Sequence, residues 1–288
     1  MHATPIPLLY ARSWDGFVYA HLSWVTLLAA SPLSSSGTEL WRLDCGQIHI
    51  PNLAYFSDSF DYEDRSGTVE NGCYLIRHGK QYLLWEAGLP GELVGKPSLD
   101  EGGWRSELRK TIVGQLHELG LVPESITLLA LSHSHGDHIG QAGRFERSTL
   151  LLHRREYARI RRSPDSNAHR RLSPWMSGRS KLVKLDGDHD VFGDGQVLLL
   201  ELPGHTEGHM GLLVRLARAG PILLSGDLYH FHSEVGSGIV SRWNTSRPET
   251  LASMGRFERI IRVLSPRVIV QHDPADLYNL PAFPASLD

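Results

Sequence analysis

Residues 132–138 read Ser132-His133-Ser134-His135-Gly136-Asp137-His138. This run places four side chains that can bind a metal, three imidazoles and one carboxylate, within six residues. A histidine in a protein core is usually an isolated residue whose hydrogen bonds are satisfied, and a cluster this dense has no such structural use. Nitrogen and oxygen donors together suit zinc and neighbouring divalent ions. The run therefore predicts a metal site.

Three further candidate ligands lie far along the chain: His205 in Pro203-Gly204-His205-Thr206, Asp227 in Ser225-Gly226-Asp227, and His272 in Gln271-His272-Asp273. All four candidate segments follow short apolar runs that are typical of strands, at 128–131, 197–202, 222–224 and 268–270. Residues just past strand ends collect on loops at one edge of a layered sheet. We therefore expect the four segments to bring five histidines and two aspartates to one point.

Seven ligands are too many for one tetrahedral ion, and they suit two ions that share one bridging carboxylate, for which Asp227 is the natural choice. A hydroxide held between two divalent cations is a strong nucleophile at neutral pH, and one of the cations can polarise a carbonyl or phosphoryl oxygen. No cysteine stands among the candidate ligands, which argues against a closed structural zinc site.

Composition indicates a folded chain of nearly neutral net charge. The 288 residues are 41% hydrophobic and 21% charged, which is enough apolar material for a sizeable core and excludes wholesale disorder. The formal net charge is -3 and there is no long basic run, so we expect no nucleic-acid partner. The longest mostly apolar stretch, 16–30, is too short and too polar to span a bilayer, so no stable membrane insertion is expected.

The N-terminus has two interpretations. Residues 16–37 place a small-residue tract after the apolar stretch, an order that resembles a secretory signal; the alternative is a poorly ordered extension. We accordingly expect a cytoplasmic or an exported chain, with an N-terminal extension over 1–38 and one folded domain over 39–288. Export would allow Cys45 and Cys73 to form a disulfide, and otherwise they remain buried thiols.

Periodicity predicts layered α/β architecture in one domain. Strand-like runs lie at 40–43, 47–50, 73–77 and 81–85, with a hairpin turn at Gly79-Lys80. Amphipathic helices are predicted over 104–120, closed by Gly120, and over 248–264, and an arginine-rich helical segment over 154–162. The longer arginine-rich tract over 154–171 is expected to form a solvated face, and the alternative is that it shapes a substrate groove.

The four ligand segments, in their order and spacing, resemble the signature of the metallo-β-lactamase superfamily. The resemblance implies an αββα sandwich, in the α/β class, with a dinuclear metal site at one edge of its sheets. It also implies the ligand sets: His133, His135 and His205 on the first ion, Asp137, His138 and His272 on the second, and Asp227 bridging two divalent ions, zinc by preference.

Within that superfamily the chain is most similar to the N-acyl homoserine lactonases. The similarity rests on 71–79 (NGCYLIRHG), 82–85 (YLLW), 225–231 (SGDLYHF), the helix start at 250–254 (TLASM) and 271–274 (QHDP). It implies a quorum-quenching hydrolase whose substrate is a small lactone, opened by a hydroxide that bridges the two metals. Asp137 would then carry the proton to the leaving alkoxide. A homodimer is left open.

The sequence departs from that family at the residue expected to face the substrate. The usual tyrosine lies three positions after the bridging aspartate, and His230 stands there, with Tyr229 one residue earlier. Neighbours on an extended segment point in opposite directions, so one of the two faces the metals. We predict that His230 does so and hydrogen-bonds the substrate, and that Tyr229 packs into the core. A smaller departure is Glu86-Ala87, where the family commonly has an acidic residue followed by a small polar one.

Alternatives remain. An organophosphate or aryl-ester hydrolase of the same fold would suit a histidine at position 230, and a lactonase for another lactone would share every motif. A metal-binding protein without catalysis is a third alternative, which the open coordination expected of seven ligands on two ions disfavours.

His209 is expected to support a ligand by a hydrogen bond. His153, His169 and His189 are expected to be exposed. Trp243 and the aromatic loop 55–62 could line a pocket or pack in the core.

Overall fold

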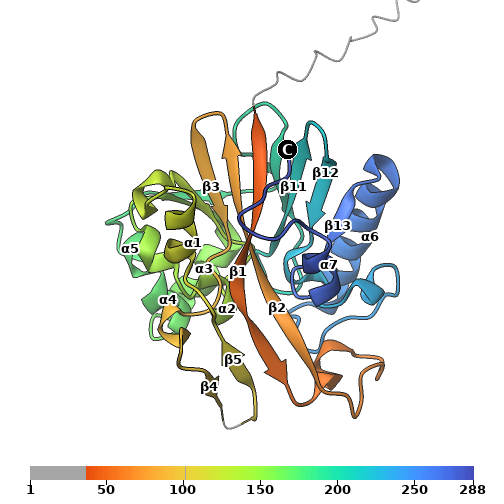
Figure 1. The fold of residues 1–288 in the computed structure, drawn as a ribbon. Coiled ribbons are helices and arrows are strands. Elements are labelled where there is room, and N and C mark those ends of the chain that lie inside the picture. The colour runs from red at the N-terminus through yellow and green to blue at the C-terminus, as the bar shows by residue number, and fades with distance from the viewer. Residues whose placement is uncertain (1–36, 101) are drawn as a thin grey trace, which may run out of the picture. The chain divides into compact units, whose positions relative to one another are not determined.

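The computed structural model describes residues 37–100 and 102–288 (Figure 1). The segment expected to be a signal or an extension, apart from its last two residues, lies outside the described residues, and the first strand begins at Thr38. No helix in the described part of the chain is long and apolar enough to cross a membrane.

Two β-sheets form the centre of the fold. The first has eight strands in the order β4-β5-β1-β2-β3-β6-β7-β8 and the second five in the order β13-β12-β11-β10-β9. In the first sheet the strands are β1 (Thr38–Ile50), β2 (Gly67–His78), β3 (Gln81–Trp85), β4 (Ser98–Leu99), β5 (Arg105–Glu107), β6 (Leu128–Ala130), β7 (Thr149–His153) and β8 (Leu182–Leu185). In the second they are β9 (His189–Asp190), β10 (Val197–Glu201), β11 (Met210–Leu216), β12 (Gly220–Leu224) and β13 (Arg267–Ile269).

Helices cover both outer faces of the paired sheets. Figure 1 shows α1 to α5 on one side of the strands and α6 and α7 on the other. The helices are α1 (Ile112–Glu118), α2 (Gly136–Ile139), α3 (Arg154–Arg162), α4 (Asn167–Arg171), α5 (Ser173–Met176), α6 (Arg247–Leu264) and α7 (Pro274–Tyr278). The layers run helix, sheet, sheet, helix, so the predicted αββα sandwich is confirmed.

Alternating side chains divide the core into layers. On β2, Tyr74 and Ile76 pack between the two sheets, whereas Leu75 packs on the other face, in the core that also holds Ile112 and Leu116 of α1. Neighbouring residues of a strand point to opposite faces, so a strand that is buried on both sides reads as an unbroken apolar run. A further apolar layer joins the second sheet to α6.

Most predicted elements occur, and one boundary was wrong. The runs 40–43 and 47–50 belong to one strand whose pairing with β2 shifts register between Asp44 and Gln47. The helix predicted over 104–120 is seven residues long and starts at Ile112, because the Thr111 side chain caps it by accepting a hydrogen bond from the Gly114 amide. Residues 105–107 pair with β1 instead. Gly120, with a φ of 71°, follows the end of the helix as expected.

Cys45 and Cys73 form a disulfide, so the chain does not carry them as two buried thiols. The bond joins β1 to β2 next to the shift in their register, and both cysteines are buried. Gly88 packs against it: a Cβ at that position would lie 2.5 Å from the Cβ of Cys45. Only glycine fits so close a contact.

Candidate metal centre

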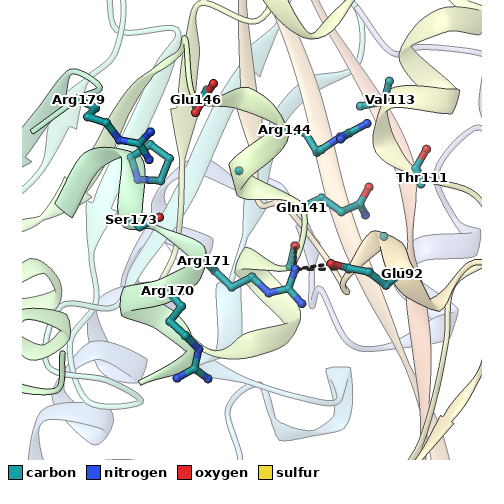
Figure 2. Close-up of a pocket in the computed structure, with 14 residues that line it drawn as sticks. Glu92, Thr111, Val113, Gln141, Arg144, Glu146, Arg170, Arg171, Ser173 and Arg179 are labelled. Atoms are coloured by element: carbon teal, nitrogen blue, oxygen red, sulfur yellow. Dashed lines mark hydrogen bonds and ion pairs between the residues drawn. The ribbon is translucent and has the colours of Figure 1, made fainter. Parts of the chain in front are cut away.

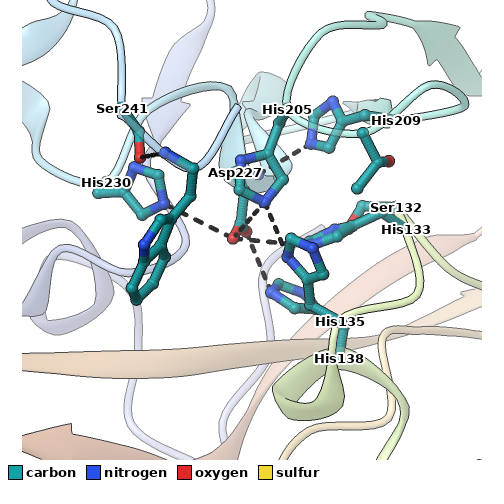
Figure 3. A network of polar contacts seen from close by, with 12 residues as sticks. Ser132, His133, His135, His138, His205, His209, Asp227, His230 and Ser241 are labelled. Carbon is teal, nitrogen blue, oxygen red and sulfur yellow. Dashed lines mark hydrogen bonds and ion pairs between the residues drawn. The ribbon is translucent and has the colours of Figure 1, made fainter. Parts of the chain in front are cut away.

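All seven predicted ligands follow strands and meet at one edge of the two sheets, on loops or, for Asp137 and His138, on the short helix α2. The segment 132–138 follows β6 of the first sheet, whereas His205, Asp227 and His272 follow β10, β12 and β13 of the second. Their metal-binding atoms form two groups, each with all its atoms within 4.8 Å of one another: His133, His135, His205 and Asp227, and then Asp137, His138 and His272. Figure 3 shows the imidazoles of His133, His135, His138 and His205 turned toward Asp227.

Asp227 belongs to the first group and also lies next to the histidines of the second. Its Oδ1 atom is 3.1 Å from His138 Nε2 and 3.2 Å from His272 Nε2. Its Oδ2 atom is 3.4 Å from His205 Nε2 and 3.7 Å from His133 Nε2. One carboxylate therefore presents an oxygen to each group, which is the arrangement that a bridging ligand requires.

The outward nitrogen of four of these histidines has a polar partner, a hydrogen bond for His133, His205 and His272 and an ion-pair contact with Glu86 for His138. His133 Nδ1 lies 2.8 Å from Ser132 Oγ, and His138 Nδ1 lies 3.2 Å from Glu86 Oε2. His205 Nδ1 lies 2.8 Å from Asn244 Oδ1, and His272 Nδ1 lies 2.7 Å from the Glu70 carbonyl oxygen. Such partners fix the ring orientation and leave Nε2 facing inward. His135 instead turns its Nδ1 inward, 3.0 Å from His205 Nε2.

The centre has the chemistry of a divalent metal site. His133 Nε2, His138 Nε2 and Asp227 Oδ1 are buried and have no hydrogen-bond partner among the described residues. Unpaired buried polar atoms are rare in folded proteins and require an explanation. Because these atoms point at one another within the two ligand groups, cations between them would satisfy all three. The residues present therefore fit two divalent ions.

The charge states of Asp227, His133 and His205 suit metal binding, whereas the pKa of His138 and of His272, which burial alone would lower, is raised by the Asp227 and Asp137 carboxylates. Burial alone would raise the pKa of Asp227, but the neighbouring His138 and His272 hold that pKa well below its usual value. Burial lowers the pKa of His205 to about 4 and that of His133 well below its ordinary value. Asp227 is therefore an anion and these two imidazoles are neutral at pH 7, the forms in which both residue types bind metals.

His209 supports the bridging residue without joining either ligand group. Its Nδ1 atom donates to the Leu202 carbonyl oxygen at 2.8 Å, and its Nε2 atom accepts from the Asp227 backbone amide at 2.9 Å. This is the supporting position that we expected of it. The expectation for His153 was wrong: it is 1% exposed, and its Nε2 atom lies 3.1 Å from a carboxylate oxygen of Glu201.

Glu156, which the sequence did not single out, ties two ligand loops together. It lies on α3, within the arginine-rich tract, and is fully buried. Its carboxylate accepts hydrogen bonds from the Ser134 amide at 3.0 Å, from Thr206 Oγ1 at 2.7 Å and from the Gly208 amide at 3.3 Å, and also from Ser134 Oγ. These donors flank His133 and His135 on one loop and His205 on the other.

A Glu156→Gln variant is expected to bind metal about 10- to 100-fold more weakly, the usual effect of removing a group that orients ligands. The glutamine amide would place donors against the donors of Ser134, Thr206 and Gly208. Competition with a chromophoric chelator measures the affinity. Glu207→Gln is the matched control, because within the described residues the Glu207 side chain makes only an exposed ion pair with Arg162. Equal affinities in both variants would show that Glu156 does not hold the loops.

Tyr229 and His230 point in opposite directions. His230 is 4% exposed, and its Nε2 atom lies 3.7 Å from Asp227 Oδ2. Its ring stacks 5.7 Å from that of His272. The Tyr229 ring is buried in the core against Phe257 of α6, 5.6 Å away. The structure therefore places His230 at the metal centre and Tyr229 outside it.

The segment that carries His230 is held by a buried carboxyl group. Glu234 Oε2 accepts from the His230 backbone amide at 2.7 Å, and Oε1 is buried with no hydrogen-bond partner among the described residues. Burial raises the pKa of Glu234 to about 7, although the amides of His230 and Phe231 oppose that shift. The group is therefore neutral in mildly acidic solution.

The raised pKa of Glu234 gives a pH dependence with a definite sign. A group whose pKa is higher in the folded state stabilises the fold below its unfolded pKa, which is 4.5 here, and that contribution is lost as the pH rises toward 7. Relative to Glu234→Gln, the wild-type free energy of unfolding should fall by about 3 kcal/mol between pH 4 and pH 8. Urea unfolding of both proteins across this range measures the difference, and parallel curves would contradict it.

A sequence model of the metallo-beta-lactamase superfamily matches residues 69–251, which hold six of the seven ligands. The chain belongs to the metallo-β-lactamase superfamily. The predicted resemblance is thereby confirmed.

Similar proteins within the superfamily are lactonases by name. The N-acyl homoserine lactonase AttM of Azorhizobium caulinodans is 28% identical over 226 residues, covering 70% of this chain and 81% of its own. An N-acyl homoserine lactonase of a Bacillus species is 27% identical over 224 residues, covering 74% and 84%.

Two solved structures share the fold. One is an N-acyl homoserine lactone hydrolase with the product N-hexanoyl-L-homoserine at its catalytic metal centre; it has a TM-score of 0.74 at 20% identity and covers 86% of this chain and 98% of its own. The other is a dizinc quorum-quenching lactonase, AidC, with a TM-score of 0.63 at 18% identity, covering 87% and 90%.

Proposed function

We propose that this chain is a dinuclear zinc hydrolase that opens the lactone ring of N-acyl homoserine lactones. The observation that carries the proposal is the Asp227 carboxylate, with one oxygen facing each of two histidine-rich groups. The curated relatives that are named as lactonases support the substrate class, and the dizinc structural relative supports the metal.

The seven ligands divide between the two ions as their positions suggest. His133, His135 and His205 would hold one ion and Asp137, His138 and His272 the other, with Asp227 bound to both. When bound, such a pair of cations supplies an activated water as nucleophile and polarises the scissile carbonyl.

Asp137 is positioned to move the proton. Its Oδ2 atom lies 3.5 Å from His138 Nε2 and 3.6 Å from His272 Nε2, and it accepts a hydrogen bond from Asn71 Nδ2 at 3.1 Å. The Asn71 amide fixes the orientation of this carboxylate beside the reacting atoms. Asp137 can therefore take the proton of the attacking water and deliver it to the alkoxide that leaves when the ring opens.

His230 contributes a hydrogen bond to the substrate. Burial holds its pKa well below the ordinary value, so at pH 7 it is a neutral imidazole with one N–H to donate. From its place beside Asp227 it can donate to the lactone carbonyl oxygen or to the departing alkoxide, where negative charge develops.

The experiment that tests the proposal combines metal analysis with a hydrolysis screen. N-acyl homoserine lactones of several chain lengths, a simple γ-lactone, an aryl ester and a phosphotriester are assayed with protein of known zinc content. We expect two zinc ions per chain and a kcat/KM for the best N-acyl homoserine lactone at least about tenfold above that of any other class, a difference of ~1.4 kcal/mol. Higher values for the γ-lactone would redirect the substrate to another lactone.

An aryl-ester or organophosphate hydrolase is the second candidate, and aromatic rings near His230 favour it. The Phe56 ring lies 4.4 Å from the His230 ring and 5.6 Å from the Trp243 ring. The Trp243 ring in turn stacks against Tyr55 at 5.4 Å and against Trp104 at 5.0 Å. Tyr55 and Trp243 are more than two-fifths exposed, and such flat faces suit an aryl group. A higher kcat/KM for the phosphotriester or the aryl ester than for any lactone would establish this function instead.

A further inference from the structure

A hollow lies among the helices, and none of its lining residues is a metal ligand. It has a volume of about 650 Å³, within the range of small-molecule sites. Its walls come from α1, α4 and α5 and from the segments 91–92, 140–146 and 179. Figure 2 shows Arg144 and Arg171 extending toward the side on which Gln141 and Glu92 lie, with Arg179 and Ser173 on the opposite side.

The lining is strongly basic for a chain of net negative charge. Four arginines, Arg144, Arg170, Arg171 and Arg179, face two glutamates, Glu92 and Glu146, whereas the whole chain carries -3. Arg171 is paired with Glu92 at 3.1 Å. Within the described residues, the other three arginines lie within 4.0 Å of no carboxylate oxygen. Arg144 shares the charge of Glu92 with Arg171, whereas the guanidinium groups of Arg170 and Arg179 have no anionic partner among the described residues.

Neutral hydrogen-bonding groups complete the lining. Thr111, Gln141 and Ser173 also line the hollow, together with the apolar Val113 and Pro174. Gln141 is held rigidly, because its Oε1 atom accepts from the Ile112 amide at 2.9 Å and its Nε2 atom donates to the Leu89 carbonyl oxygen at 3.0 Å. This part of the lining is therefore fixed before a ligand binds.

We propose that this hollow, which we call the arginine pocket, binds a phosphorylated small molecule with at least two negative charges. A guanidinium group presents a planar fork of N–H donors that matches phosphate oxygens in pairs. Several such forks around one hollow that opens to solvent favour a compact polyanion, and the volume is too small for a folded macromolecular partner. The proposal does not depend on the lactonase activity.

The arginine pocket adjoins the backbone that carries two metal ligands. Asp137 and His138 lie on α2, and Gly140 directly follows it. Arg171 Nη1 donates to the Gly140 carbonyl oxygen at 3.1 Å. Gly140 is closely packed, since a Cβ there would lie 2.2 Å from the Pro90 nitrogen. A ligand that engages Arg171 therefore contacts a rigid segment, so its binding energy is not lost in ordering the chain.

Calorimetric titration of the zinc-loaded enzyme with a hexose bisphosphate, at fixed ionic strength, tests the proposal. We expect saturable binding that weakens at least about tenfold in the Arg144→Ala/Arg179→Ala double variant. Both side chains are exposed, so the variant should fold. Arg147→Ala is the control: it removes one positive charge, against two in the double variant, three residues from Arg144 and from a side chain that is 77% exposed and outside the arginine pocket.

Arginine modification locates the ligand independently of affinity. Phenylglyoxal labelling read by mass spectrometry should show the hexose bisphosphate protecting Arg144 and Arg179 but not Arg147, in the wild type and equally in Asp227→Asn. Absence of saturable binding, an equal loss in Arg147→Ala, or protection that disappears in Asp227→Asn would overturn the proposal. Succinate binding as tightly as the bisphosphate would overturn the assignment to phosphate.

Discussion

An Asp227→Asn variant should lose both metal ions and at least about a thousandfold in kcat, equivalent to ~4 kcal/mol of transition-state stabilisation. The reason is the position of the carboxylate, whose two oxygens lie 3.1 Å and 3.4 Å from imidazoles of the two opposing groups. A neutral amide offers a single oxygen and no charge, so it cannot hold two cations together. Metal content by mass spectrometry and steady-state hydrolysis of the lactone measure the two effects.

Asp186→Asn is the control for Asp227. Its side chain is 68% exposed and makes a surface ion pair with Arg154 at 3.4 Å, a contact worth about 1 kcal/mol or less. That variant should keep both its metal content and its activity. If Asp227→Asn retained nearly two ions per chain together with its turnover, the bridging role of Asp227 would be refuted.

His230→Ala should reduce kcat about a hundredfold or more while leaving the metal content intact. The loss of one donor to a developing oxyanion costs about 2.7–4 kcal/mol, and the Nε2 atom of His230 points at Asp227. Tyr229→Phe is the natural comparison, because it removes a hydroxyl that lies at the core side, 3.4 Å from a carboxylate oxygen of Glu258. We expect this second variant to remain within a few-fold of the wild type.

The two variants distinguish the roles of neighbouring residues. Metal analysis shows whether a fall in kcat reflects the lost donor or the lost ions, and a KM that changes little in His230→Ala would place the lost contact in the transition state. A larger loss of kcat in Tyr229→Phe than in His230→Ala would reverse the assignment and give Tyr229 the role of the family's tyrosine.

The candidate site was readable from the sequence because its signals are local. Each ligand follows a short apolar run, and strands that run in one direction end at one edge of a sheet, so His205, Asp227 and His272 could be placed beside 132–138 without knowing the fold in detail. The opposite orientation of Tyr229 and His230 follows from the same strand geometry.

Other features depend on contacts that the sequence does not display. Glu156 lies in a tract of arginines, and only the folded chain shows that this one side chain turns inward to Ser134 and Thr206. His153 resembles any polar residue at a strand end, but it is buried beside Glu201. The predicted helix began too early because the apolar spacing typical of a helix continues on the N-terminal side of Thr111. Residues 105–107 pair with β1 instead, and this tertiary contact is not visible in the sequence.

The division of the ligands between the two sheets affects how the loaded protein can open. Four ligands extend from the first sheet and three from the second, and between the sheets lies an apolar layer. If the proposed ions are bound, separation of the sheets would break coordination bonds as well as expose that layer, so partial unfolding would carry the cost of releasing metal. In the metal-free chain each sheet, with its helices, could fluctuate on its own. Amide hydrogen exchange would then be faster in both sheets of the metal-free chain than in the loaded enzyme.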